Sequence, residues 1–118
     1  MGALYLLPRV VGQAKAAELL YLGDAIDAGE AYRIGLANRV VAHERLMEEA
    51  RALADRLKEG PLYALGVTKG LLEREATMSL EEALEAEAVA QAECMQRPDF
   101  QEGYKAFVEK RKEVFNQG

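Results

Sequence analysis

Glutamates are the most concentrated chemically capable side chains in this sequence. They crowd one short segment: Glu81, Glu82, Glu85, Glu87 and Glu93. Paired carboxylates can act as general acid and base when their surroundings separate their pKa values. Apolar residues recur at helical spacing through the same segment: Leu80, Ala83, Leu84, Ala88, Ala92 and Met95. Because these define an opposite, inward face, we interpret the glutamates as a solvated acidic face and not as a catalytic pair.

One cysteine and one histidine offer the next possible chemistry. Cys94 and His43 could form a thiol–imidazole pair of the kind found in nucleophilic catalysis, but they lie in different segments and we do not expect them to meet. A single cysteine excludes an intrachain disulfide. The two residues together cannot supply a four-ligand zinc site of cysteine and histidine, so the sequence predicts no metal site.

The densest positive cluster is Lys110-Arg111-Lys112, near the end of a chain whose formal net charge is -5. Such a cluster can steer an anionic ligand, or it can simply favour the C-terminus of a helix. The negative overall charge argues against a general nucleic-acid binder, which needs a basic field.

The expected compartment follows from the apolar segments. No apolar run approaches the roughly 20 residues that span a bilayer. The apolar start, Met1 to Val11, carries Pro8 and Arg9 and lacks both the basic n-region and the cleavage site of a signal peptide. We therefore expect a cytoplasmic protein that makes no membrane contact.

The elements that must position these groups are almost all helices. Periodicity and capping signals predict helices over 13–22, 28–34, 43–58, 62–76 and 80–96, and a last one after Pro98. The stretch 2–7 should end at Pro8, because proline disfavours helical geometry in the residue before it. Arg39-Val40-Val41 is the one plausible strand, and it is too short to form a sheet alone.

Capping boxes and glycines give these expectations their detail. Ser79 with Glu82 forms one capping box, and Asp27 with Glu30 has the same spacing. Gly66 and Gly70 lie inside a predicted helix, where each costs about 1 kcal/mol against alanine, which suggests close packing on a neighbour. We predict a single helical domain over 1–118 that relies on partner surface.

Several motifs in one order resemble the enoyl-CoA hydratase/isomerase (crotonase) family. Residues 23–31 (GDAIDAGEA) and 35–41 (GLANRVV) are similar to the segment that follows the catalytic core in that family. Further matches lie at LLPRVVG (6–12), Thr68-Lys69, MSLEEA (78–83), FQEG (100–103) and AFVEKR (106–111). The resemblance covers nearly the whole chain, with Ala37 departing from the usual valine.

The resemblance implies a mainly α fold: the C-terminal helical, trimerisation-type domain of the crotonase fold, with one short extended segment. Family members are about twice as long, and their upstream half is a catalytic spiral of β-β-α turns. That half supplies both the oxyanion-hole amides and the acid/base carboxylates. No residue of this chain is therefore assigned a catalytic role, and we expect the isolated chain to be inactive.

The resemblance also implies a binding site on the last helix. Phe107 and Lys110 match positions that help to hold coenzyme A, often across a subunit interface, with Phe107 against adenine or pantetheine and Lys110 on a phosphate. The alternative is that Phe107 is a core residue at helical spacing from Tyr104, and Lys110 an ordinary surface lysine.

The activity implied is hydration or double-bond isomerisation of an acyl-CoA thioester through an enolate. Coenzyme A enters as part of the substrate, with no metal or redox cofactor, and the enzyme is expected to be a trimeric or hexameric homo-oligomer. A helical oligomerisation module without catalytic activity is the alternative function.

Overall fold

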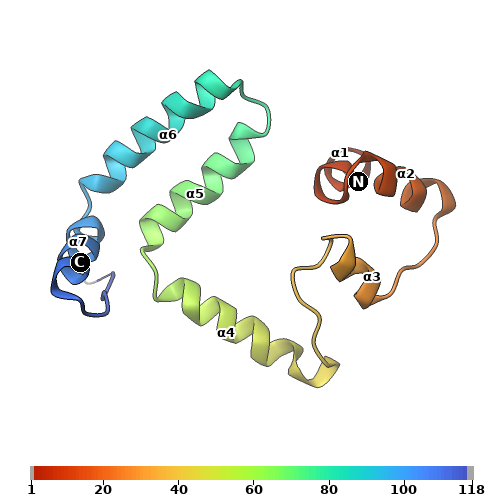
Figure 1. Ribbon diagram of the computed structural model, residues 1–118, viewed down its shortest axis with the longest axis horizontal. Helices are drawn as coiled ribbons and strands as arrows, with labels where there is room; N and C mark the ends of the chain where they lie inside the picture. The colour runs from red at the N-terminus through yellow and green to blue at the C-terminus, as the bar shows by residue number, and fades with distance from the viewer. Residues whose placement is uncertain (1, 117–118) are drawn as a thin grey trace. The chain divides into compact units, whose positions relative to one another are not determined.

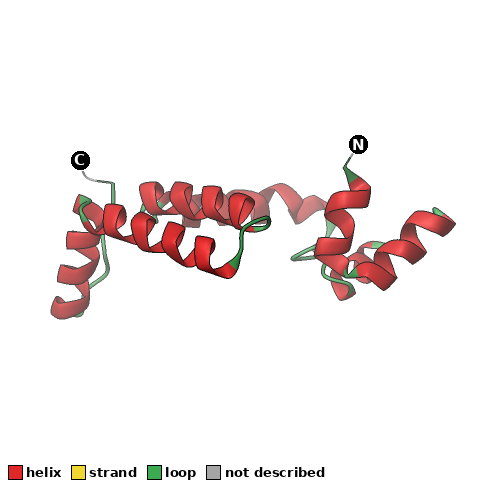
Figure 2. Cartoon of the chain, turned by 90° about the horizontal axis from the view of Figure 1, so that it is seen from above, coloured by secondary structure: helices red, strands yellow, loops and turns green. Residues whose placement is uncertain are grey.

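The computed structural model describes residues 2–116, and every regular element in that range is helical (Figures 1 and 2). The chain divides into two compact units, Met1–Leu46 and Met47–Gly118. The mainly α class predicted from the sequence is confirmed. The prediction of a single domain over 1–118 stays a prediction, and each unit is described by itself.

The first unit contains three α-helices and one 3₁₀ turn: α1 (Ala3–Val11), α2 (Gln13–Leu22), α3 (Ala28–Arg33) and η1 (His43–Arg45). Helices α1 and α2 pack against each other across Gly12, whose φ of 82° is readily available to glycine. Ala16 of α2 is 1% exposed and is the buried residue of this unit within the described range. Gly23, also at positive φ, ends α2 where the sequence predicts.

The expected stop at Pro8 is wrong, because α1 continues through Pro8 to Val11. Proline lacks the N–H that would bond four residues back, but its effect on the preceding residue is a bias and not a prohibition. The guanidinium of Arg9 donates to the Tyr5 carbonyl at 2.6 Å and stacks 3.6 Å from the centre of the Tyr5 ring. These contacts supply local stabilisation beside the proline.

Helix α3 begins with half of the predicted capping box. The Asp27 carboxylate accepts from the Glu30 amide at 2.7 Å, but the Glu30 carboxylate receives the Arg33 guanidinium instead, at 2.6 and 2.7 Å. Lys15 reaches Glu30 at 3.4 Å, so α2 and α3 share one ion-pair cluster. Residues 39–42 are neither helical nor paired with a strand in the described chain, which leaves Arg39-Val40-Val41 as an isolated non-helical segment.

The second unit is built from α4 (Leu46–Lys58), which starts at the boundary, α5 (Leu62–Glu75), α6 (Leu80–Met95) and α7 (Pro98–Glu109). Helices α5 and α6 lie side by side, α6 contacts α7, and α4 packs along no other described helix of this unit (Figure 1). The capping box at α6 is complete: Ser79 Oγ accepts from the Glu82 amide, and Glu82 Oε2 accepts from the Ser79 amide at 2.8 Å.

The inward face of α6 differs from the predicted one. Leu80 is 76% and Leu84 56% exposed, whereas Ala86 and Ala90 are half-buried and line the space shared with α5. Small residues pack between the two helices, and the leucine stripe is left uncovered. The helix itself was predicted correctly from the hydrophobic spacing. The side of it that faces α5 is decided by packing with that helix, which the spacing does not encode.

Gly66 and Gly70 have open space around them: a Cβ added at either would meet nothing within 4 Å in the described chain. The close packing expected there is therefore not made within the chain. Of the described residues of the second unit, only Ala106 of α7 is buried, at 2% exposed.

Candidate functional site

The end of α7 gathers the residues that the sequence singles out for ligand binding. Phe107 is 83% exposed, so the alternative in which it is a core residue of this chain is wrong. It stands beside Tyr104 at the rim of an apolar cavity of about 370 Å³, which Phe100, Phe115 and Tyr63 help to line. An exposed phenylalanine at an aromatic cavity can pack against a flat or apolar group of a ligand.

Lys110 follows α7 directly, three residues after Phe107. Its φ of 54° and ψ of 40° place its backbone in the left-handed region, and it caps the helix. The Lys110 amide donates to Phe107 O at 3.3 Å, and the Arg111 amide donates to Ala106 O at 3.1 Å. This is the helix ending that glycine usually provides, and here a lysine takes its place.

Of the three basic residues predicted as a cluster at 110–112, two are paired with carboxylates and one is not. Arg111 bonds Glu102 through Nη1 at 2.6 Å and Nη2 at 2.9 Å, and its Nε bonds Glu109 at 2.6 Å. Lys112 pairs with Glu59 at 3.1 Å. Lys110 makes no side-chain hydrogen bond or ion pair with any described residue. Its ammonium is therefore the member of the cluster that remains available to an anion.

The pKa of Glu102 shows that its ionised form is strongly stabilised by its partners. The Arg111 fork, followed by the Val114 amide at 2.9 Å, lowers the pKa of Glu102 to about 2. Glu102 and Glu109 in turn raise the pKa of Arg111 above its already high value. A bidentate Arg–carboxylate pair of this kind fixes orientation as well as charge.

The segment after α7 folds back along the second unit, which the sequence analysis did not foresee. Asn116 donates from its side chain to Lys58 O at 3.3 Å and Gly60 O at 2.9 Å, and accepts from the Leu62 amide at 3.3 Å. Its own amide donates to Asp99 at 2.9 Å. One asparagine thus ties the α4–α5 turn to the start of α7. No periodic signal marks contacts made at separations of 54 to 58 residues.

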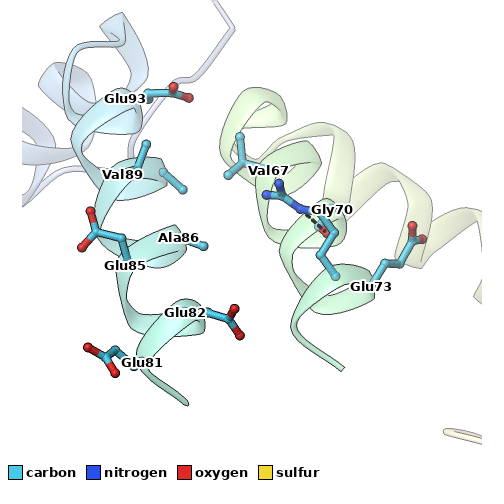
Figure 3. A pocket seen from close by; sticks show the side chains of 11 residues that line it. Val67, Gly70, Glu73, Glu81, Glu82, Glu85, Ala86, Val89 and Glu93 are labelled. Atoms are coloured by element: carbon cyan, nitrogen blue, oxygen red, sulfur yellow. Dashed lines mark hydrogen bonds between the residues drawn. The ribbon is translucent and has the colours of Figure 1, made fainter. Parts of the chain in front are cut away.

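The acidic face of α6 is solvated, as predicted. Its five glutamates are exposed, and four of them border a groove of about 1040 Å³ between α5 and α6. Figure 3 shows Val67 and Val89 facing each other across this groove, while Glu85 turns its carboxylate away from α5. The Ser79 backbone and hydroxyl groups lower the pKa of Glu82, so this side chain is held as a carboxylate and is unsuited to act as a general acid.

Neither of the remaining candidates has a described reactive partner within its own unit. Cys94 is half-buried in α6, and the unit that contains it has no histidine, because the single His43 begins η1 in the first unit. Among residues 2–116 no group of three potential metal ligands comes together. In the same range, no helix is long and apolar enough to cross a membrane.

Comparison with known proteins decides the family. The model of the family described as enoyl-CoA hydratase/isomerase matches residues 1–118. The chain belongs to the enoyl-CoA hydratase/isomerase family. The resemblance inferred from the motifs is thereby confirmed at the level of the family.

Individual family members agree in sequence and in fold. A crotonyl-CoA hydratase of Syntrophomonas wolfei is 39% identical over 114 residues, covering 97% of this chain and 44% of the relative. A 1,2-epoxyphenylacetyl-CoA isomerase of Escherichia coli is 35% identical, with the same coverage. The crystal structure of a putative enoyl-CoA hydratase from Streptomyces coelicolor superimposes with a TM-score of 0.93 at 46% identity, covering 99% of this chain and 42% of that one.

The chain thus spans less than half the length of the family members it matches. The names of these relatives give two different reactions, a hydration and an isomerisation, but each name gives a CoA thioester as the substrate. Membership of the family therefore does not single out one reaction. The helical arrangement described above is shared with the enoyl-CoA hydratase fold over nearly the whole chain.

Proposed function

We propose that this chain is the C-terminal part of an enoyl-CoA hydratase/isomerase and that the end of its α7 contacts the coenzyme A portion of the substrate. The enzyme would hydrate a 2-enoyl-CoA or shift its double bond, in either case through a thioester enolate. Hydration adds water and isomerisation moves a proton, so neither needs a redox cofactor. Coenzyme A is part of the substrate, and we propose that no metal takes part.

The observation that carries the proposed contact is the division of the basic cluster. Arg111 and Lys112 are neutralised by Glu102, Glu109 and Glu59, while Lys110 keeps an unpaired ammonium within the described chain, three residues from the exposed Phe107. A compact ammonium suits a phosphate oxygen, and an exposed aromatic ring suits a base or an alkyl chain.

The catalytic groups of this enzyme are expected outside these 118 residues. Oxyanion stabilisation is usually the largest catalytic contribution, and loss of one donor costs on the order of 10²–10³ in rate. The acidic face of α6 offers no substitute, because its glutamates are solvated and Glu82 is held ionised. With a single cysteine and an acyl-CoA substrate, we place the enzyme in the cytoplasm.

The proposed contact is tested by calorimetric titration of coenzyme A into the chain at low and moderate salt. Lys110→Ala should weaken binding by about 1 kcal/mol, roughly fivefold, and the loss should shrink as salt rises. Phe107→Leu should weaken binding nearly independently of salt, because it acts through apolar area. Lys112→Ala, which removes a paired charge from the same segment, is the matched control. Equal binding by wild type and Lys110→Ala would refute the contact.

A second candidate function is an oligomerisation module without catalysis, favoured by the uncovered leucine stripe of α6. Crotonyl-CoA hydration, followed by loss of the conjugated thioester absorbance, tests whether the isolated chain acts alone. We expect no turnover. Turnover that disappeared on Glu81→Gln or Glu85→Gln would instead place an active site on α6.

A further inference from the structure

Lys110 adopts a backbone conformation that its side chain does not favour. Left-handed geometry brings Cβ close to the following carbonyl oxygen, so it is unfavourable for an L-residue other than glycine. The Lys110 side chain forms no compensating bond with a described residue. The conformation must therefore be held by its neighbours in the chain.

Those neighbours are fixed on both sides of Lys110. The two terminal nitrogens of Arg111 bond Glu102, which lies nine residues earlier in α7. Its Nε bonds Glu109, the residue that precedes Lys110. Arg111 also donates to Lys112 O at 3.1 Å, and Glu102 accepts from the Val114 amide. These bonds and those of Asn116 hold the segment after α7, and the bonds next to Lys110 are made by the Arg111 guanidinium.

We propose that Glu102 and Arg111 are positioning residues that hold Lys110 in its left-handed conformation and direct its ammonium toward the phosphate of the ligand. All three guanidinium nitrogens of Arg111 are engaged, Nε with Glu109, Nη1 with Glu102 and Lys112 O, and Nη2 with Glu102, so we assign Arg111 to positioning and not to the anion. This proposal rests on the proposed coenzyme A contact of Lys110. It adds Glu102 and Arg111 as residues that act through Lys110, a role that the sequence motif alone did not separate from ligand binding.

The consequence concerns a substitution that preserves charge. Arg111→Lys keeps the net charge of the segment but cannot bond both oxygens of Glu102 and Glu109 at once. If Arg111 acts through Lys110, the variant should loosen the left-handed turn and weaken coenzyme A binding. Lys112→Arg, another charge-preserving exchange one residue away, is the matched control.

The experiment is a double-mutant cycle in the 118-residue chain, with coenzyme A as the probe. Binding is measured by calorimetry for wild type, Lys110→Ala, Arg111→Lys, the double variant and Lys112→Arg. The backbone of residue 110 is followed by the three-bond HN–Hα coupling and the Cα chemical shift. We expect Arg111→Lys to weaken binding about threefold to fivefold, to reduce the left-handed population at Lys110, and to add nothing in the Lys110→Ala background. Lys112→Arg should match wild type.

The outcomes separate the two proposals. If Lys110→Ala weakens binding but Arg111→Lys does not, the positioning role is overturned and the proposed contact stands. If Arg111→Lys weakens binding equally in the wild-type and Lys110→Ala backgrounds, it acts elsewhere and the positioning role is again overturned. If wild type does not bind, or Lys110→Ala binds as wild type does, the proposed contact fails and the positioning role falls with it.

Discussion

Two residues other than glycine have positive φ in the described chain, and they make opposite use of it. Lys110 has φ 54° with no side-chain bond, whereas Asn116 has φ 62° with three side-chain hydrogen bonds to Lys58, Gly60 and Leu62. Asparagine tolerates this region better than lysine does. No described bond of the Lys110 side chain offsets its unfavourable backbone conformation. This is what we expect of a residue whose side chain serves binding.

We predict that Lys110→Gly stabilises the chain while it abolishes the lysine's share of coenzyme A binding. Relief of left-handed strain, less the extra entropy of unfolded glycine, should raise the free energy of unfolding by about 0.5–1 kcal/mol. Urea denaturation measures it. Asn116→Gly is the matched control and should destabilise, because three hydrogen bonds are lost. A Lys110→Gly variant less stable than wild type would show that the lysine side chain has a structural role.

The Glu102–Arg111 pair predicts a pH dependence whose sign follows from the pKa. The folded pKa of Glu102, about 2, lies below its ordinary value of 4.5, so the ionised form stabilises the folded C-terminal segment. That contribution is complete above about pH 4.5 and is lost as pH falls toward 2.

Carboxyl-carbon NMR should therefore give Glu102 a midpoint near 2, with the Val114 amide shifting at the same midpoint. Glu102→Gln should lower the protection of the Val114 amide from hydrogen exchange at pH 6, and this difference should be about halved near pH 2 and vanish at lower pH. Glu85→Gln, at a residue without a described ion pair, is the control. A Glu102 midpoint near its ordinary value would mean that the Arg111 bridge is not formed in solution.

At the scale of the elements, sequence reasoning succeeded where local chemistry decides the structure. Ser79 and Glu82 begin α6 as predicted, and Gly23 ends α2 at the expected residue. Reasoning failed where distant contacts decide: the face of α6 that meets α5, and the return of Asn116 to the α4–α5 turn. In the candidate site, Phe107 and Lys110 were predicted from the family motif. That Arg111 is paired and Lys110 is not could be seen only from the partners Glu102 and Glu109, which hydrophobic periodicity does not reveal.

Helix α5 carries a prediction of its own. Gly66→Ala and Gly70→Ala each add up to about 1 kcal/mol of helix propensity, and the new Cβ meets nothing within 4 Å. We expect each variant to raise the helicity and thermal midpoint of the monomeric chain, read by circular dichroism at low concentration. Gly60→Ala is the control that should not gain, because its Cβ would lie 3.2 Å from Leu65 Cδ1 and 3.3 Å from Leu57 O. Unchanged or lower midpoints for both helix variants would contradict the propensity argument.

At the scale of the whole molecule, the described chain leaves most of its large apolar side chains uncovered. Within the second unit, helix α4 packs along no other described helix, although Leu46, Leu53 and Leu57 recur along it at helical spacing and are exposed. Exposed apolar surface of this extent marks interaction sites in soluble proteins. The Gly66 and Gly70 positions, open in this chain, would allow another helix to approach α5 closely.

We therefore predict that the chain self-associates, as a trimer or a multiple of one. Burying a leucine side chain is worth about 1.5–3 kcal/mol, so three symmetric contacts through the Leu80 and Leu84 stripe of α6 would stabilise an assembly appreciably. Light scattering at tens of micromolar should give three or six times the mass of one chain. Leu84→Glu should shift the mass toward the monomer, since a carboxylate cannot be buried there without a partner. The neighbouring Glu85→Gln, on the acidic face, should leave the mass unchanged. A strictly monomeric wild type with a cooperative melt would show instead that the leucine stripe of α6 needs no cover from a second copy.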